Sequence, residues 1–218
     1  MEHIYCISGF GADEQMFSKL TFNGYEVHHL KWLIPDKNES LVSYAHRMAD
    51  QLLHSNVILV GLSFGGMMSI EISKLIPVKA VILISSIKSF HEMPNWMKFA
   101  GRLNLHKIIP LRSGKLTYHF QNNNLGVETP EEIKIAQAYR KNVNQQYTDW
   151  AIDIILKWKN EWQPPRLFHI HGRADRIFPI KKIKNCMSIQ TGTHFMIMNR
   201  SREVNAAIQK VLAQLSLK

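Results

Sequence analysis

A glycine-rich turn between an apolar segment and a helical segment constrains this chain more than any other part of it. Residues 57–60 read Val-Ile-Leu-Val, the hexapeptide GLSFGG occupies 61–66, and a segment with helical spacing follows. A strand that turns sharply into a helix strains the residue at the turn, here Ser63. The residues two before and two after it must then be almost free of side chain, and Gly61 and Gly65 meet that demand. The pattern predicts a strand, a tight turn and a helix.

The G-x-S-x-G pattern has two interpretations. Serine and glycine are common residues, so a purely structural turn is one of them. The other is a catalytic serine, because the positive dipole end of the following helix favours a developing oxyanion. The strand-turn-helix setting and two segments further along the chain favour the catalytic interpretation.

Strand and helix patterns alternate along most of the chain. Short apolar segments predict strands at 3–8, 26–32, 56–62, 79–85, 166–171 and 186–190. Helical spacing predicts helices at 13–20, 40–53, 67–75 and 201–215. Several of the predicted strands are continuous apolar runs, which is typical of strands covered on both faces. We therefore expect an α/β fold with a mainly parallel sheet of about six strands, flanked by helices.

Residues 87–165 interrupt this alternation. Their pattern is helical, no strand is predicted among them, and they are rich in large aromatic rings. The tetrapeptide TPEE at 129–132 indicates a helix start, with a Thr cap, a Pro in the first turn and a Glu three residues after the cap. We expect 1–86 and 166–218 to form a core and 87–165 to form a helical cap, in a single domain. Most of the rings are expected to pack the cap onto the core, and a few to line a pocket.

Two further polar residues are expected at the same edge of the sheet as Ser63. Asp175 lies in the segment HGRADRIFP (171–179) after the fifth predicted strand, and His194 lies in TGTHF (191–195) after the sixth. A serine nucleophile needs a general base, and the base needs an acid to orient it. Asp175 could instead pair with a neighbouring arginine, and His194 is one of eleven histidines. The three residues are expected at one edge of the sheet and occur along the chain in the order Ser, Asp, His, which favours a shared site.

An oxyanion hole requires two backbone N–H groups near the serine. One is expected from Phe64, the residue after Ser63, and the other from Phe10 in the loop after the first strand. The Phe10 side chain is also expected to help line an acyl pocket.

Charge and hydropathy limit the other classes of function. The formal net charge is +10 at pH 7 and most of it lies in the C-terminal quarter, but the basic residues are dispersed and no nucleic-acid motif accompanies them. We therefore expect no nucleic-acid partner. The sequence contains no uninterrupted run of 18 apolar residues, so no membrane span is predicted. The first residues run directly into a strand without a signal-peptide pattern, so a cytoplasmic location is expected.

The sequence predicts neither a cofactor nor a metal. His169 and His171 are two residues apart on a predicted strand and so point to one face, but no further His or Cys stands at metal-binding spacing near them. Neither a P-loop nor a complete G-x-G-x-x-G is present. The two cysteines, Cys6 and Cys186, are expected to be free thiols, with a disulfide as the alternative.

These segments together resemble the α/β-hydrolase superfamily over nearly the whole chain. The matching residues are GLSFGG at 61–66, HGRAD at 171–175 with Pro179 following, and THF at 193–195. The chain is similar to a compact member that lacks the family's first two strands. One departure is SGFG at 8–11, where many members place His-Gly before the oxyanion residue.

The resemblance implies a triad of Ser63, His194 and Asp175, an oxyanion hole near Phe10 and Phe64, and a helical cap. The expected function is a serine hydrolase that cleaves a small carboxylic ester or thioester through an acyl-enzyme, as a monomer or homodimer. The same triad serves acyl transfer, C–C hydrolysis or lyase chemistry in this superfamily, so those alternatives remain. A ligand receptor without turnover and a basic interaction module are the alternatives outside enzymes.

Overall fold

The computed structural model describes residues 1–108, 115–141 and 144–217. Within these ranges one six-stranded parallel sheet has the order β2-β1-β3-β4-β5-β6. The strands are β1 (Glu2–Ile7), β2 (Tyr25–Leu30), β3 (Ile58–Leu62), β4 (Ala80–Ile84), β5 (Leu167–Gly172) and β6 (Met187–Ile189). The expected α/β fold with a parallel sheet of six strands is confirmed.

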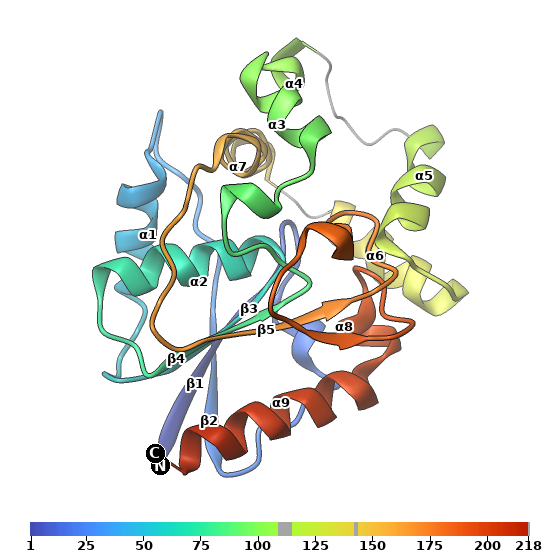
Figure 1. Cartoon of the computed structure of the whole chain (residues 1–218). Helices are drawn as coiled ribbons and strands as arrows, with labels where there is room; N and C mark the ends of the chain where they lie inside the picture. The colour runs from blue at the N-terminus through green and yellow to red at the C-terminus, as the bar shows by residue number, and fades with distance from the viewer. Residues whose placement is uncertain (109–114, 142–143, 218) are drawn as a thin grey trace.

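Helices cover both faces of the sheet, as Figure 1 shows. On one face lie α1 (Leu41–Ala49) and α2 (Phe64–Leu75), and on the other α8 (Met196–Asn199) and α9 (Ser201–Ser216). A short 3-10 helix, η1 (Glu14–Phe17), follows β1, and another, η3 (Ile180–Lys182), precedes β6.

Alternating residues of each strand enter two separate hydrophobic cores, because successive side chains point to opposite faces. Tyr5 and Ile7 of β1 pack in the core on the α1 and α2 side, whereas Ile4 and Cys6 pack with α9. Burial on both faces explains why the strand segments are continuous apolar runs.

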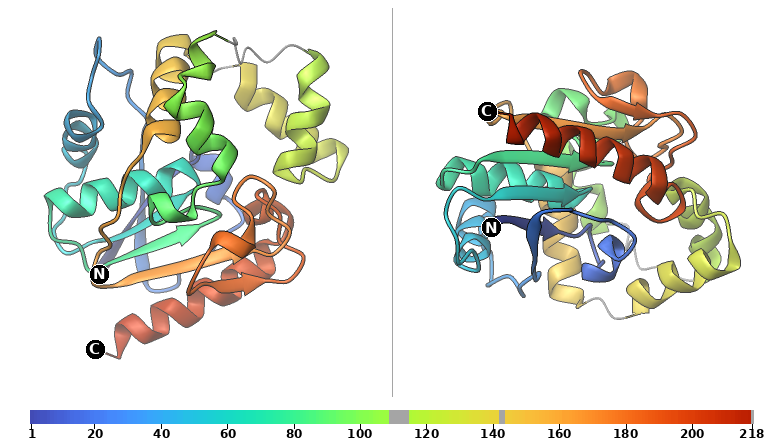
Figure 2. Two further views of the ribbon diagram at one scale, coloured as in Figure 1. Left: turned by 45° about the horizontal axis from the view of Figure 1, so that its top comes forward. Right: turned by 90° about the horizontal axis from the view of Figure 1, so that it is seen from below.

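The residues between β4 and β5 that the structure describes form helices joined by loops, with no strand among them. They form η2 (Phe90–Glu92), α3 (Asn95–Arg102), α4 (Leu105–Ile108), α5 (Lys115–Leu125), α6 (Pro130–Lys141) and α7 (Gln145–Lys157). Both views in Figure 2 place α5 and α6 beyond the ends at which the strand arrows point. The predicted cap, 87–165, includes residues 109–114 and 142–143, which lie outside the described residues, and its division from the core stays a prediction.

The helix start expected at Thr129 is present. The Glu132 N–H donates to Thr129 Oγ1 (3.2 Å), and Glu132 Oε2 accepts from the N–H groups of Thr129 (3.4 Å) and Glu128 (2.7 Å). This reciprocal capping begins α6. Of the helices that the structure describes, none combines the length and the apolar character needed to cross a membrane.

The turn between β3 and α2 leaves no room for side chains at its glycines. A Cβ on Gly61 would overlap the backbone of Gly65 and Gly66, and a Cβ on Gly65 would overlap the carbonyl oxygens of Ile7 and Ser8. The helix therefore begins directly against the end of β1, and Ser63 takes φ 52° and ψ −116° at the turn.

We expect Gly65→Ala to destabilise the protein strongly. Its new methyl group meets backbone atoms that no rotamer change can move, so the free energy of unfolding should fall by about 3 kcal/mol or more. Gly9→Ala is the matched control, because a Cβ there would lie at an ordinary 3.5 Å from Ser63 Cβ. Urea denaturation of both variants measures the difference, and equal losses of stability would contradict the steric argument.

Candidate active site

Ser63 is held at the carboxyl end of β3 by its own backbone. Its N–H donates to the carbonyl of Ile84 (2.9 Å), and its carbonyl accepts from the Gly66 N–H (2.9 Å) and from Ser86 Oγ (2.6 Å). A non-glycine residue at positive φ costs about 1–3 kcal/mol and persists only where the surroundings enforce it. The residue is half-buried.

The three residues predicted as a triad lie in hydrogen-bond contact. His194 Nε2 is 3.0 Å from Ser63 Oγ, and His194 Nδ1 is 2.8 Å from Asp175 Oδ2. Asp175 follows β5 and His194 follows β6, so the two residues lie after neighbouring strands of the sheet. Both residues are buried, with 4% and 8% of their surface exposed.

The second oxygen of Asp175 is fixed by the backbone of its own loop. Oδ1 accepts from the N–H groups of Ile177 (2.8 Å) and Phe178 (2.8 Å). His171 Nε2 donates to the Phe178 carbonyl (2.8 Å) and also lies 3.5 Å from Asp175 Oδ2. The carboxylate is therefore fixed in orientation toward His194.

Of the two residues predicted to supply oxyanion donors, Phe64 directly follows Ser63, and Phe10 directly follows Gly9, which lies beside Ser63. Phe64 is the first residue of α2, where N–H groups have no partner within the helix. Phe10 is the second residue of a turn closed by the Ala12 N–H and the Gly9 carbonyl (3.1 Å). Gly9 itself lies against Ser63, so this turn borders the serine.

An aromatic wall stands beside this turn. Trp32 stacks on Phe64, with ring centroids 4.9 Å apart and planes within 4°, and its Nε1 donates to Ser8 Oγ (3.1 Å). Tyr147 of α7 lies 5.6 Å from the Trp32 ring and 6.0 Å from the Phe10 ring. The sequence analysis singled out Phe10 and Phe64 but neither Trp32 nor Tyr147. Nothing in the spacing of those two residues indicates that a loop and an inserted helix bring them to this place.

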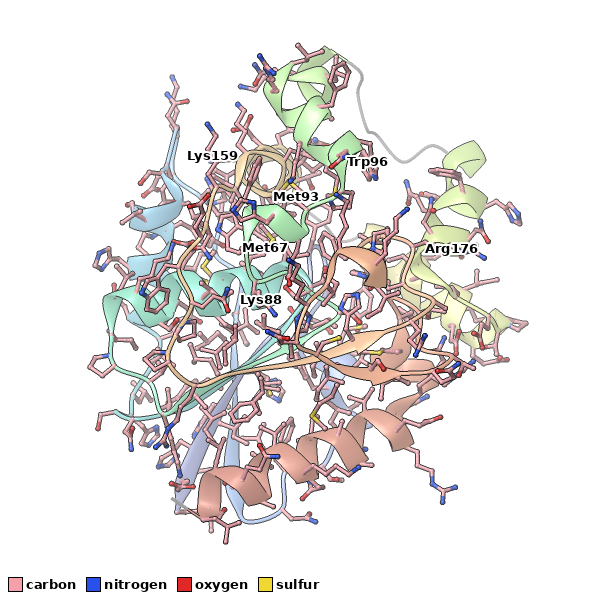
Figure 3. The ribbon with its side chains drawn as sticks, viewed as in Figure 1. Met67, Lys88, Met93, Trp96, Lys159 and Arg176 are labelled. Atoms are coloured by element: carbon pink, nitrogen blue, oxygen red, sulfur yellow. The ribbon has the colours of Figure 1, made fainter. Side chains whose placement is uncertain are left out.

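The inserted helices contact the loop that carries His194. The Phe195 N–H donates to the carbonyl of Leu125 at the end of α5 (2.9 Å), and Thr193 Oγ1 donates to the Gly126 carbonyl (3.2 Å). Arg176, which points toward α5 in Figure 3, donates to the Asn123 carbonyl (3.1 Å). The loops of Asp175 and His194 are thus both attached to the same end of α5.

A cavity of about 190 Å³ lies next to these attachments. It is lined by Asn123, Gly126, Val127, Glu128, Ala174, Arg176 and Thr193. Ser63 does not line it, so this cavity borders the Asp175 and His194 loops rather than Ser63.

A buried ion pair joins the loop after β4 to the loop before β6. Lys88, labelled in Figure 3, places Nζ 3.4 Å from Glu92 Oε1, and Glu92 Oε2 accepts from the Lys88 N–H (2.9 Å). Glu92 Oε1 also accepts from the Lys184 N–H (3.1 Å). The sequence analysis did not identify this pair, which fixes the edge of the sheet beside the candidate site.

His169 and His171 are buried on β5. Desolvation lowers the pKa of both imidazoles, and for His169 the neighbouring His171 and then Lys88 lower the pKa further. Among the described residues no third ligand forms a metal-binding group with these two. Cys6 and Cys186 are both free thiols, as expected.

The structure resembles solved structures over almost its full length. A thermophilic esterase from Thermogutta terrifontis with malate bound has a TM-score of 0.76 at 16% sequence identity, covering 99% of this chain and 90% of that one. A bromoperoxidase from Bacillus anthracis has a TM-score of 0.69 at 17% sequence identity, covering 97% of this chain and 92% of that one. An epoxide hydrolase from Bacillus megaterium in complex with an inhibitor has a TM-score of 0.66 at 15% sequence identity, covering 98% of this chain and 94% of that one. The sequence matches no protein-family model and no curated protein. At these identities the likeness shows the fold.

We expect acid to destabilise the protein through its buried histidines. Because the folded-state pKa of His169 lies well below its usual value of about 6.5, only the unfolded chain binds a proton just below that pH. The free energy of unfolding should therefore fall as the pH drops below about 6.5, by up to about 1.4 kcal/mol per pH unit for each such histidine.

His169→Leu should make this pH dependence shallower, while His46→Ala, on the exposed side of α1, should leave it unchanged. Urea denaturation between pH 7.5 and 5.0 measures the slopes. The same slope in native protein and His169→Leu would show that this imidazole does not contribute.

Proposed function

We propose that this chain, which has the α/β-hydrolase fold, is a serine hydrolase that cleaves a small carboxylic ester or thioester. The observation that carries the proposal is the continuous hydrogen-bonded series from Ser63 Oγ through both ring nitrogens of His194 to Asp175. His194, the proposed base, lies between Ser63 and Asp175, the arrangement that activation of a serine requires.

In this mechanism Ser63 Oγ attacks the carbonyl carbon of the substrate while His194 Nε2 accepts the hydroxyl proton. Asp175 stabilises the imidazolium that forms and keeps Nδ1 protonated. The imidazolium then protonates the leaving alcohol or thiol, and an acyl group remains on Ser63. Water, deprotonated by His194, attacks the acyl carbon and releases the acid and the free serine.

The tetrahedral intermediate places a negative charge on the former carbonyl oxygen. The backbone N–H groups of Phe10 and Phe64 are the proposed donors, because Phe10 follows Gly9, which lies beside Ser63, and Phe64 follows Ser63 and begins α2. The positive end of the α2 dipole adds to the stabilisation. Loss of one such donor typically costs about 10²–10³ in kcat.

The aromatic wall supports an apolar substrate group. Trp32, Phe64 and Tyr147 pack against one another, with Phe64 and Tyr147 buried, and Phe10, which stacks on Tyr147, is 38% exposed. Such walls favour an apolar acyl or alcohol group of modest size.

The fold by itself does not select among these reactions, since its solved neighbours include an esterase, a bromoperoxidase and an epoxide hydrolase. Acyl transfer would use the same acyl-enzyme with an acceptor other than water. A receptor without turnover would keep the bound ligand intact.

We expect a fluorophosphonate probe to label the native protein covalently and stoichiometrically. Ser63→Ala should remove the labelling, because the Ser63 hydroxyl is the group in contact with His194 Nε2. Ser73→Ala is the matched control in α2, where Ser73 Oγ donates to the Ile70 carbonyl, and it should be labelled like the native protein. Intact-mass spectrometry measures the adduct. Native protein that is folded but unlabelled would refute the activated serine.

We expect Asp175→Asn to lower kcat for short p-nitrophenyl esters by about 10³–10⁴ with a smaller change in KM. An amide favours the wrong imidazole tautomer, and the corresponding change in the well-studied Ser-His-Asp template costs about 10⁴. Steady-state kinetics on a series of acyl lengths measures the loss and the preferred chain. Unchanged kcat would remove Asp175 from the mechanism, and binding of esters without product release would favour a receptor.

A further inference from the structure

Three histidines converge near the amino end of the sheet. His3 belongs to β1, His28 to β2, and His54 to the loop that precedes β3. Each offers one ring nitrogen, and these three nitrogens all lie within 4.8 Å of one another. The residues are far apart in sequence, so no ligand spacing indicates the cluster, and only strand pairing brings them together.

A carboxylate accompanies the three imidazoles. Glu26 pairs with His3 in the register of β1 and β2, and Tyr5 pairs with His28, so these side chains share one face of the sheet. Glu26 Oε2 lies 3.5 Å from His3 Nδ1, and Oε1 lies 3.6 Å from His28 Nε2. Three imidazole nitrogens therefore face one small volume, and the Glu26 carboxylate lies beside two of them.

We propose that His3, His28 and His54, with Glu26, bind a single Zn²⁺ ion. Imidazole nitrogen and carboxylate oxygen are ligands that zinc accepts in tetrahedral sites. His3 Nδ1 and His28 Nε2 are 3.1 Å apart, close to the separation of about 3.3 Å between two nitrogens at zinc–nitrogen distances of about 2.0–2.1 Å. The ion is not proposed to take part in the reaction at Ser63.

The metal would replace a proton that now lies between two rings. The His3–His28 contact is a hydrogen bond between two nitrogens, so one of them carries the hydrogen. Once zinc occupies that place, the donor imidazole carries its proton on its other nitrogen, and both rings remain neutral. The rings of His3 and His54 are stacked, 3.5 Å apart and 12° from parallel, so binding requires one of them to rotate about its Cβ–Cγ bond. All three histidines are only partly buried, which leaves room for that rotation.

His54 is already oriented by a second residue. Its Nδ1 lies 2.7 Å from the hydroxyl of Tyr5, which also accepts from the Leu53 N–H (3.1 Å). This contact leaves Nε2 as the ligand atom, in the manner of outer hydrogen bonds that orient metal-binding histidines.

The proposed site lies at the opposite end of the strands from Ser63. His3 and Ile7 stand near the two ends of β1, about 13 Å apart at a strand rise of about 3.3 Å per residue. The ion would join the edge strand β2 and the loop before β3 to β1. Its effect is therefore on the stability of this part of the fold, because a metal that binds only the folded state stabilises it.

The test uses the full chain without a histidine tag, freed of metal by a chelator and titrated with Zn²⁺. We expect one Zn²⁺ per chain by calorimetry and elemental analysis, together with a rise in Tm. His28→Ala and His54→Ala should weaken binding by more than roughly 100-fold, beyond the typical effect of an outer partner, and Tyr5→Phe by roughly 10- to 100-fold. Co²⁺ should give the visible absorption of a tetrahedral site in the native protein.

His29→Ala is the matched control, because residue 29 is next to His28 but on the other face of β2, where its ring contacts Phe17. It should bind Zn²⁺ like the native protein. Glu26→Gln keeps all three imidazoles and should weaken binding less than His28→Ala, which gives a reading even if one histidine variant does not fold. No binding by the native protein, or equal affinity in the His28, His54 and His29 variants, would overturn the proposal.

Discussion

The candidate site depends on a backbone contact that excludes side chains. Helix α2 begins directly against the carbonyl oxygens of Ile7 and Ser8, and Gly65 permits this approach because it has no Cβ. The approach places the first N–H groups of α2 beside the loop after β1, which contains Phe10. It also forces Ser63 to positive φ, so the serine lies above the strand ends between the two proposed donors. The backbone strain at Ser63 therefore accompanies the close approach of this serine to its proposed oxyanion donors.

The remaining parts of the site are contributed by loops at the same edge of a parallel sheet. Parallel strands end at one edge, so residues far apart in sequence, such as Ser63, Asp175 and His194, need only follow neighbouring strands to meet. The precision comes from local hydrogen bonds. The N–H groups of Ile177 and Phe178 fix Asp175, and the buried Lys88–Glu92 pair holds the adjacent loops.

The strands and the meeting of the three polar residues were predictable because each depends on a pattern that is local in sequence. Continuous apolar runs indicate strands buried on both faces, and a polar residue just after such a run lies at the edge of the sheet. Trp32 and Tyr147 were not predictable, since their contact depends on the path of a loop and the orientation of α7. The cluster of His3, His28 and His54 was missed for a related reason, because it depends on the pairing register of β1 with β2 and on a loop that returns beneath them.

The attachment of the His194 loop to the end of α5 makes the geometry of the candidate site depend on the position of that helix. Leu125 and Gly126 hold the residues on either side of the imidazole through their carbonyl groups. Any movement that carried this end of α5 away from the sheet would draw His194 away from Ser63 as well. The contact between Ser63 and His194 therefore depends on an element that lies outside the sheet and its loops.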